Sequence, residues 1–305
     1  GRRMIPVFLI GICWGASLGA QTVLRTSELE MEVTDKGAVV RLTGLKSGVN
    51  YAPSAPPGFL LRVKVAGGGE LVPRGVKALK GVLRFGFDGG IELDVRAEEE
   101  ADYLRFELVK AVPSERIDAV LWGPLNTTIG ETIGEVVGVV RDEDFALGIQ
   151  ALNAKTCGGK LVNEEGTTGG RTAATAEEFG SSLQAFTVNQ ARDRTITVWN
   201  LFRNVPVKAL PGFALEGSAL ALFGAAPSEV LPLIGRIELA EGLPHPVIDG
   251  AWVKTSPAPG RPYLIAAFSE ADIDALFARA DLENAINLIE IILDKNAFPS
   301  YLSDR

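Results

Sequence analysis

The chain has 305 residues, of which 47% are hydrophobic and 22% charged, so it carries enough apolar side chains to bury a sizeable core. Its 38 acidic and 30 basic residues give a formal net charge of −8, which disfavours a nucleic-acid partner because phosphate binding needs a basic face. With one histidine and two cysteines, zinc sites built from His and Cys, iron–sulfur clusters and most Ser/His/Asp triads are poor candidates.

Residues 1–20 have the order of features found in a secretory signal peptide. Arg2 and Arg3 precede an apolar run from Ile5 to Ile12, and small residues follow up to Ala20. The run is shorter than the roughly 20 residues that a membrane helix needs, so we expect no stable membrane span after cleavage. These features predict a secreted or periplasmic protein.

Residues 21–241 are predicted to form one large antiparallel β-sandwich. Apolar and charged residues alternate strictly in several segments, which predicts strands with one dry face: 61–65, 91–96 and 104–108. Gly and Asp residues at 35–37 and 88–90 are typical of hairpin turns. No helix is expected between about 22 and 225. A short helical stretch is expected to open at Pro227 and run toward Leu239.

The remaining residues predict a linker and the start of a different structure. Residues 242–262 carry five prolines and predict a Pro-rich linker. The unbroken apolar run 263–268 predicts a strand buried on both faces, and the apolar spacing after it predicts an amphipathic helix. A barrel of eight such β/α units needs about 250 residues. We therefore interpret residues 263–305 as an incomplete barrel start, truncated either naturally or by an error in the gene model.

Three runs carry a family resemblance: residues 122–142, 145–156 and 238–246. They resemble the N-terminal part of large secreted bacterial glycoside hydrolases, and are similar to α-galactosidase (melibiase-like) enzymes, in which a β-supersandwich precedes a catalytic (β/α)8 barrel. In such enzymes the working carboxylates lie at the ends of later barrel strands, which this sequence does not reach. The resemblance therefore implies a non-catalytic part of an exported enzyme that acts on poly- or oligosaccharide, inactive alone, and no catalytic residue is assigned.

Tryptophans are the first candidate carbohydrate-binding residues, because the apolar face of a pyranose ring can lie on an indole. Trp122 and Trp252 stand beside Gly123-Pro124 and Asp249-Gly250, which predicts that both lie in turns, where binding residues concentrate. Asp249 is a candidate with them. The alternative is that the tryptophans belong to the core.

Acidic residues are the second candidates. A spacing of four would place Glu131 and Glu135 on one face if residues 127–140 form strand and turn, although solvated glutamates on an outer face are a competing interpretation. Residues 142–144 could offer oxygens to Ca²⁺, or could form a charged hairpin turn. No metal ligand or cofactor is assigned.

Two other functions remain open beside the hydrolase. One is a carbohydrate-binding module without hydrolase activity, and the other is a structural or protein-interaction domain of the cell envelope. The predicted β/α start favours the hydrolase, since neither alternative requires it.

Overall fold

The computed structural model describes residues 21–136, 138–161, 173–198, 202–248 and 250–256. The chain divides into two compact units, one ending at Pro244 and the other beginning at His245, and each is described by itself. The predicted signal peptide and the predicted barrel start at residues 263–305 lie outside the described residues.

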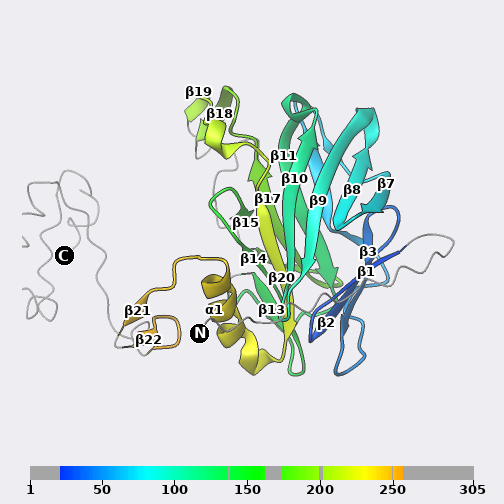
Figure 1. The fold of residues 1–305 in the computed structure, drawn as a ribbon, viewed down its shortest axis with the longest axis vertical. Helices are drawn as coiled ribbons and strands as arrows, with labels where there is room; N and C mark the ends of the chain where they lie inside the picture. Colours follow the sequence, from blue (N-terminus) through cyan, green and yellow to red (C-terminus); the bar gives the residue numbers. More distant parts are fainter. Residues whose placement is uncertain (1–20, 137, 162–172, 199–201, 249, 257–305) are drawn as a thin grey trace, which may run out of the picture. The chain divides into compact units, whose positions relative to one another are not determined.

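Antiparallel sheets build the first unit, which confirms the predicted mainly β fold (Figure 1). Sheet A has the order β1-β2-β3-β4, with β1 (Thr22–Arg25), β2 (Leu29–Val33), β3 (Ala38–Gly44) and β4 (Gly58–Phe59). Sheet B has the order β15-β17-β11-β5-β6, with β16 beside β17: β5 (Leu61–Val65), β6 (Glu70–Leu71), β11 (Ile117–Thr127), β15 (Cys157–Gly158), β16 (Ala174–Glu177) and β17 (Gly180–Val188).

Sheet C is the largest, with the order β12-β13-β14-β20-β10-β9-β8-β7. Its strands are β7 (Gly75–Leu79), β8 (Val82–Phe87), β9 (Ile91–Glu99), β10 (Leu104–Val112), β12 (Thr132–Ile133), β13 (Val139–Arg141), β14 (Ala146–Ala151) and β20 (Ala219–Ala225). A separate hairpin joins β18 (Arg194–Val198) to β19 (Phe202–Val207). In the second unit β21 (Val247–Ile248) pairs with β22 (Ala251–Trp252).

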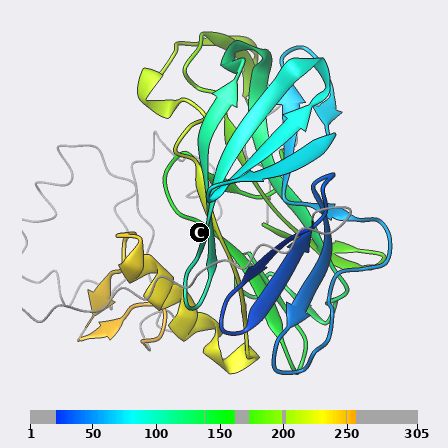
Figure 2. The ribbon, with the colours of Figure 1, turned by 45° about the vertical axis from the view of Figure 1, so that its right-hand side comes forward.

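One apolar core lies between the sheets, as a sandwich requires. Its buried side chains come from β5, β11 and β17 of sheet B, from β8, β9, β10, β14 and β20 of sheet C, and from β2 and β3 of sheet A. Figure 2 shows sheet A, in blue, below the cyan strands β8 and β9. The alternation along β2 and β8 places every second side chain in this core, as the period of two predicts.

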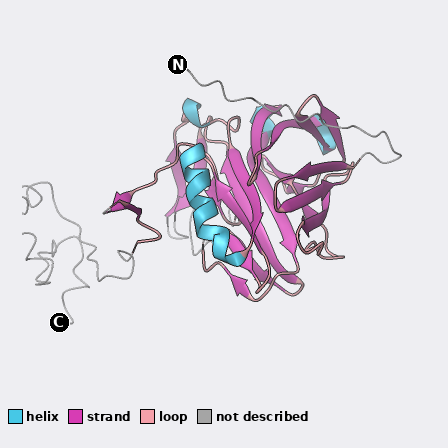
Figure 3. Cartoon of the chain, turned by 60° about the horizontal axis from the view of Figure 1, so that its bottom comes forward, coloured by secondary structure: helices cyan, strands magenta, loops and turns pink. Residues whose placement is uncertain are grey.

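The helix α1 (Val230–Ala240) covers the outer face of sheet C, as Figure 3 shows. A 3-10 turn at Pro227–Glu229 leads into it, which confirms the predicted helical stretch. The helix buries apolar residues at the i, i+3, i+4 and i+7 spacing of one face: Val230, Leu233, Ile234 and Ile237. All residues of β20 are buried, because this strand has the core on one side and the layer of α1 on the other.

A cross-strand ion pair on sheet C joins Arg84 to Asp94. Arg84 binds Asp94 through two hydrogen bonds, of 2.7 Å to Oδ1 and 2.9 Å to Oδ2, and only 11% of the Asp94 side chain is exposed. The bond to Arg84 holds the pKa of Asp94 below its usual value, although burial opposes the shift.

We expect Asp94 to contribute stability that is fully present above its ordinary pKa and lost as pH falls through its lower folded pKa. Asp94→Asn should therefore lower the midpoint of urea unfolding at pH 7. It should also reduce the difference between the midpoints measured at pH 7 and at pH 3. Asp88→Asn is the matched control. Asp88 makes a similar ion pair with Arg74, but 55% of the Asp88 side chain is exposed. An equal change in both variants would contradict a special role for the buried pair.

Candidate functional site

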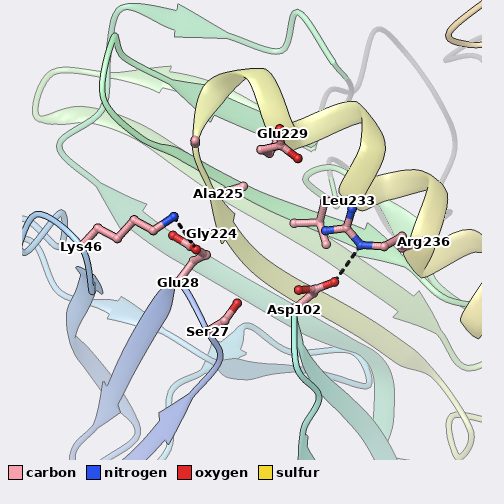
Figure 4. A pocket seen from close by; sticks show the side chains of 10 residues that line it. Ser27, Glu28, Lys46, Asp102, Gly224, Ala225, Glu229, Leu233 and Arg236 are labelled. Carbon is pink, nitrogen blue, oxygen red and sulfur yellow. Dashed lines mark hydrogen bonds and ion pairs between the residues drawn. The ribbon is translucent and has the colours of Figure 1, made fainter.

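A cleft of about 290 Å³ lies where sheet A, sheet C and α1 meet within the first unit (Figure 4). Its charged walls come from segments far apart in the sequence: Glu28, Lys46, Asp102, Glu229 and Arg236. Its apolar and small lining residues are Gly224, Ala225, Ala226 and Leu233, and Ser27 completes it.

Backbone hydrogen bonds between turns fix the walls of this cleft. The Ser27 N–H donates to the carbonyl oxygen of Ala101 (2.8 Å), which ties the β1–β2 turn to the β9–β10 turn that carries Asp102. The Leu45 N–H donates to the Glu28 carbonyl oxygen (2.9 Å), which holds the segment with Lys46 against the same turn. These two bonds hold the backbones of the segments that carry Ser27, Asp102 and Lys46 together.

Polar side chains fasten the far end of α1 to sheet C. The Tyr103 hydroxyl donates to Glu241 Oε1 (2.6 Å), and Arg105 Nε donates to Glu241 Oε2 (3.2 Å). Burial and then the bond to Glu241 raise the pKa of Tyr103 above its usual value, which keeps this hydroxyl protonated as a donor at neutral pH. The helix that roofs the cleft is thus held at its C-terminal end.

The cleft offers hydrogen-bonding groups of both kinds above a small apolar floor. Lys46 Nζ lies 2.8 Å from Glu28 Oε1, and Arg236 Nε lies 2.8 Å from Asp102 Oδ2, as the dashed lines of Figure 4 mark. Glu229 forms no ion pair with the described residues. The lining therefore contains three carboxylates and two cationic side chains. Carboxylates accept hydrogen bonds from hydroxyl groups, and ammonium or guanidinium groups donate to them. This set suits a neutral, polyhydroxylated ligand better than an anion.

Trp122 does not lie in a turn, so that prediction is wrong. It is part of β11, with 1% of its surface exposed, and it belongs to the apolar core between the sheets. Gly123 has a φ of +97°, and a Cβ there would lie 2.6 Å from the Leu183 carbonyl oxygen, so the Gly-Pro pair makes an irregularity inside the strand rather than a turn. No indole face of Trp122 is open to a sugar.

Trp122 instead belongs to a buried polar cluster centred on Ser218. Its Nε1–H donates to Ser218 Oγ (2.9 Å), and the same oxygen lies 2.5 Å from Thr187 Oγ1 and 3.1 Å from Thr156 Oγ1. The three hydroxyl residues are themselves buried, so they satisfy one another away from water. The cluster joins β11, β17 and the segments that flank β15 and β20.

Glu131 and Glu135 do not share one face of a strand. Glu131 precedes β12, and Glu135 lies in the turn between β12 and β13, where its carboxylate binds Arg141 Nε at 2.7 Å. Both glutamates are exposed. This placement favours the interpretation of solvated glutamates, and it keeps both residues out of the cleft lining.

Trp252 belongs to the second unit and lies in the short strand β22 rather than in a turn. Its ring stacks on His245 with ring centroids 4.8 Å apart, and Lys254 Nζ lies 5.0 Å from its centroid. With 8% of its surface exposed, the indole offers little face to a sugar. Asp249, the neighbouring candidate, lies outside the described residues.

The acidic run at residues 142–144 forms the turn between β13 and β14. Asp142 Oδ1 accepts from the backbone N–H groups of Asp144 (2.9 Å) and Phe145 (2.7 Å), which is how aspartate closes such turns. Among the described residues, no group of three or more His, Cys, Asp or Glu residues is placed to hold a metal ion. The same part of the chain contains no helix with the length and apolarity that crossing a membrane requires.

The cleft residues were not predicted from the sequence. The charged residues of the cleft lie in turns beside strands, in the 3-10 turn before α1 or on α1 itself, and the lining residues from Ser27 to Arg236 share no short motif. A scan against protein-family models finds no match to this chain, and no curated protein matches it significantly.

Proposed function

We propose that this chain is the non-catalytic β-sandwich part of an exported glycoside hydrolase acting on poly- or oligosaccharide, and that the cleft under α1 holds saccharide. The main support for this site is the cleft lining, in which carboxylates and cationic side chains surround small apolar residues. The export and the enzyme class rest on the pattern of residues 1–20 and on the three runs that resemble α-galactosidase-like enzymes.

The chemistry of a sugar matches this lining in two ways. Neighbouring hydroxyl groups can donate to Glu28, Asp102 or Glu229 while accepting from Lys46 or Arg236. The C–H face of the ring can rest on the floor formed by Gly224 and Ala225, beside Leu233 of α1. Without an aromatic platform in the lining, we expect weak binding that depends on these polar contacts.

We expect Glu229→Gln to weaken saccharide binding about tenfold and to cost at most about 1 kcal/mol of stability, because Glu229 stands at the N-terminal end of α1, where a negative charge is favourable. The affinity falls because a hydrogen bond to a charged group contributes roughly 1.5–3 kcal/mol. No described ion pair is lost with the Glu229 carboxylate. A glycan array of α- and β-linked oligosaccharides would select the probe, and isothermal titration would compare the variants. Glu131→Gln is the matched control, because Glu131 is also an exposed glutamate but lies outside the cleft.

Two results would contradict this proposal. Equal saccharide affinity in the wild type, Glu229→Gln and Glu131→Gln would remove the cleft as the site. Turnover of aryl glycosides by this chain, abolished by Glu131→Gln or Glu135→Gln, would show that it is catalytic by itself.

A further inference from the structure

The charges that line the cleft under α1 do not cancel one another. Its two cationic side chains are each occupied by a carboxylate of the same lining, since Lys46 lies 2.8 Å from Glu28 and Arg236 lies 2.8 Å from Asp102. The third carboxylate, that of Glu229, forms no ion pair with the part of the chain that the structure describes. The lining therefore has an excess of negative charge, and this excess is located at Glu229.

The turn between β9 and β10 adds negative charge beside the cleft. This turn carries Asp102 of the lining, and it follows directly on Glu99, the last residue of β9, and Glu100. Both glutamates are exposed, and Glu99 accepts from the backbone N–H of Arg25 (2.6 Å), while the Arg25 guanidinium pairs with Glu30. A backbone N–H leaves the charge of a carboxylate in place. Because a cleft bordered by one sign of charge attracts ligands of the opposite sign, this cleft favours a cation over a neutral ligand.

We propose that the saccharide of this cleft is an amino sugar, in which a primary ammonium group replaces one ring hydroxyl, and that Glu229 binds this ammonium group. The inference rests on the proposed function, because it names the class of saccharide for the same cleft. An ammonium group donates hydrogen bonds and accepts none, so it suits a carboxylate and is disfavoured beside Lys46 or Arg236. Figure 4 shows Glu229 on the α1 side of the cleft, with Glu28 and Asp102 on the opposite side. The paired carboxylates thus stay available to the hydroxyl groups of the ligand.

Three matched ligands test this inference by isothermal titration. They are β-1,4-linked oligomers of glucosamine, of N-acetylglucosamine and of glucose, of equal length, which differ only in the substituent on C2 of each ring. The titration is made below the pKa of the sugar amine and at low ionic strength. We expect the glucosamine oligomer to bind about fivefold more tightly than the other two, which is the upper end for an ion pair that water can reach. Added sodium chloride should reduce this preference.

Glu229→Gln should abolish the preference, so that the three oligomers bind with equal affinity. Glu131→Gln is the matched control: Glu131 is an exposed glutamate outside the cleft, and its loss should leave the preference at about fivefold. A preference that persists in Glu229→Gln would overturn the inference, because the acidic chain as a whole would then attract the amine.

Failure of this inference differs from failure of the saccharide site. Equal affinity of the wild type for the three oligomers, or binding of another oligosaccharide but not of the glucosamine oligomer, would overturn the amino sugar and leave the cleft as a saccharide site. Absence of binding to every oligosaccharide of the glycan array would remove both.

Discussion

Trp122→Ala is expected to lower the free energy of unfolding by about 3–5 kcal/mol, the usual cost of removing a large aromatic side chain from a packed core. Trp122 is 1% exposed, and its loss also removes the donor to Ser218 Oγ in the buried hydroxyl cluster. Urea unfolding followed by circular dichroism measures this change.

Trp122→Phe separates packing from hydrogen bonding. It keeps most of the ring but removes the Nε1–H, and we expect a smaller loss of roughly 1–2 kcal/mol. If Trp122→Ala unfolded at the same urea concentration as the wild type but lost saccharide binding, the assignment of Trp122 to the core would be wrong. Trp122 would then be a carbohydrate-binding residue.

Gly148→Val is expected to cost about 3 kcal/mol, at the upper end of what overpacking usually costs. Gly148 stands directly opposite Phe223 on β14 and β20, and a Cβ at Gly148 would lie 2.3 Å from the Phe223 ring. Phe223 is fully buried, so its ring has no room to move away. The glycine therefore makes space for a phenylalanine that lies across the strand.

Gly86→Val is the matched control for this substitution. Gly86 also lies inside a strand of sheet C, and the nearest atom to a Cβ there is 4.0 Å away. We expect a loss well below that of Gly148→Val in the same urea experiment. Equal losses would mean that glycine-to-valine changes in this sheet are costly for a reason other than the contact with Phe223.

The local sequence pattern predicted those strands that bury one face and expose the other. Alternation located β5, β9 and β10, and the turn at residues 35–37 works because Gly37 adopts a φ of +78°. The prediction missed β20, although its sequence is an unbroken apolar run. Unbroken apolarity is typical of a strand buried on both faces, and residues 219–225 show that pattern as clearly as residues 263–268 do.

Tertiary contacts decided what the sequence left open. The Gly-Pro pair after Trp122 predicts an exposed turn, but the hydroxyl of Ser218, 96 residues away, gives the indole a buried partner. The cleft depends on contacts of similar range, such as the bond from Arg236 to Asp102 across 134 residues. Charged residues at strand ends carry no local signal of such a meeting, so only the folded chain brings them together.

The cleft also gives the helix α1 a role beyond covering the sheet. Leu233 and Arg236 on the helix form one wall, and the bonds from Tyr103 and Arg105 to Glu241 hold that wall in place. A saccharide that binds there should therefore meet a preformed site, which limits the ordering cost of binding.

An NMR titration of the labelled protein with the oligosaccharide selected on the glycan array tests the saccharide site most directly. The account predicts that the backbone amide signals that move are those of the cleft lining, including Ser27, Gly224, Ala225 and Leu233, and that Glu229→Gln reduces these changes. Changes centred instead on Trp252 or on the hairpin that carries Glu135, or no changes with any oligosaccharide, would contradict it.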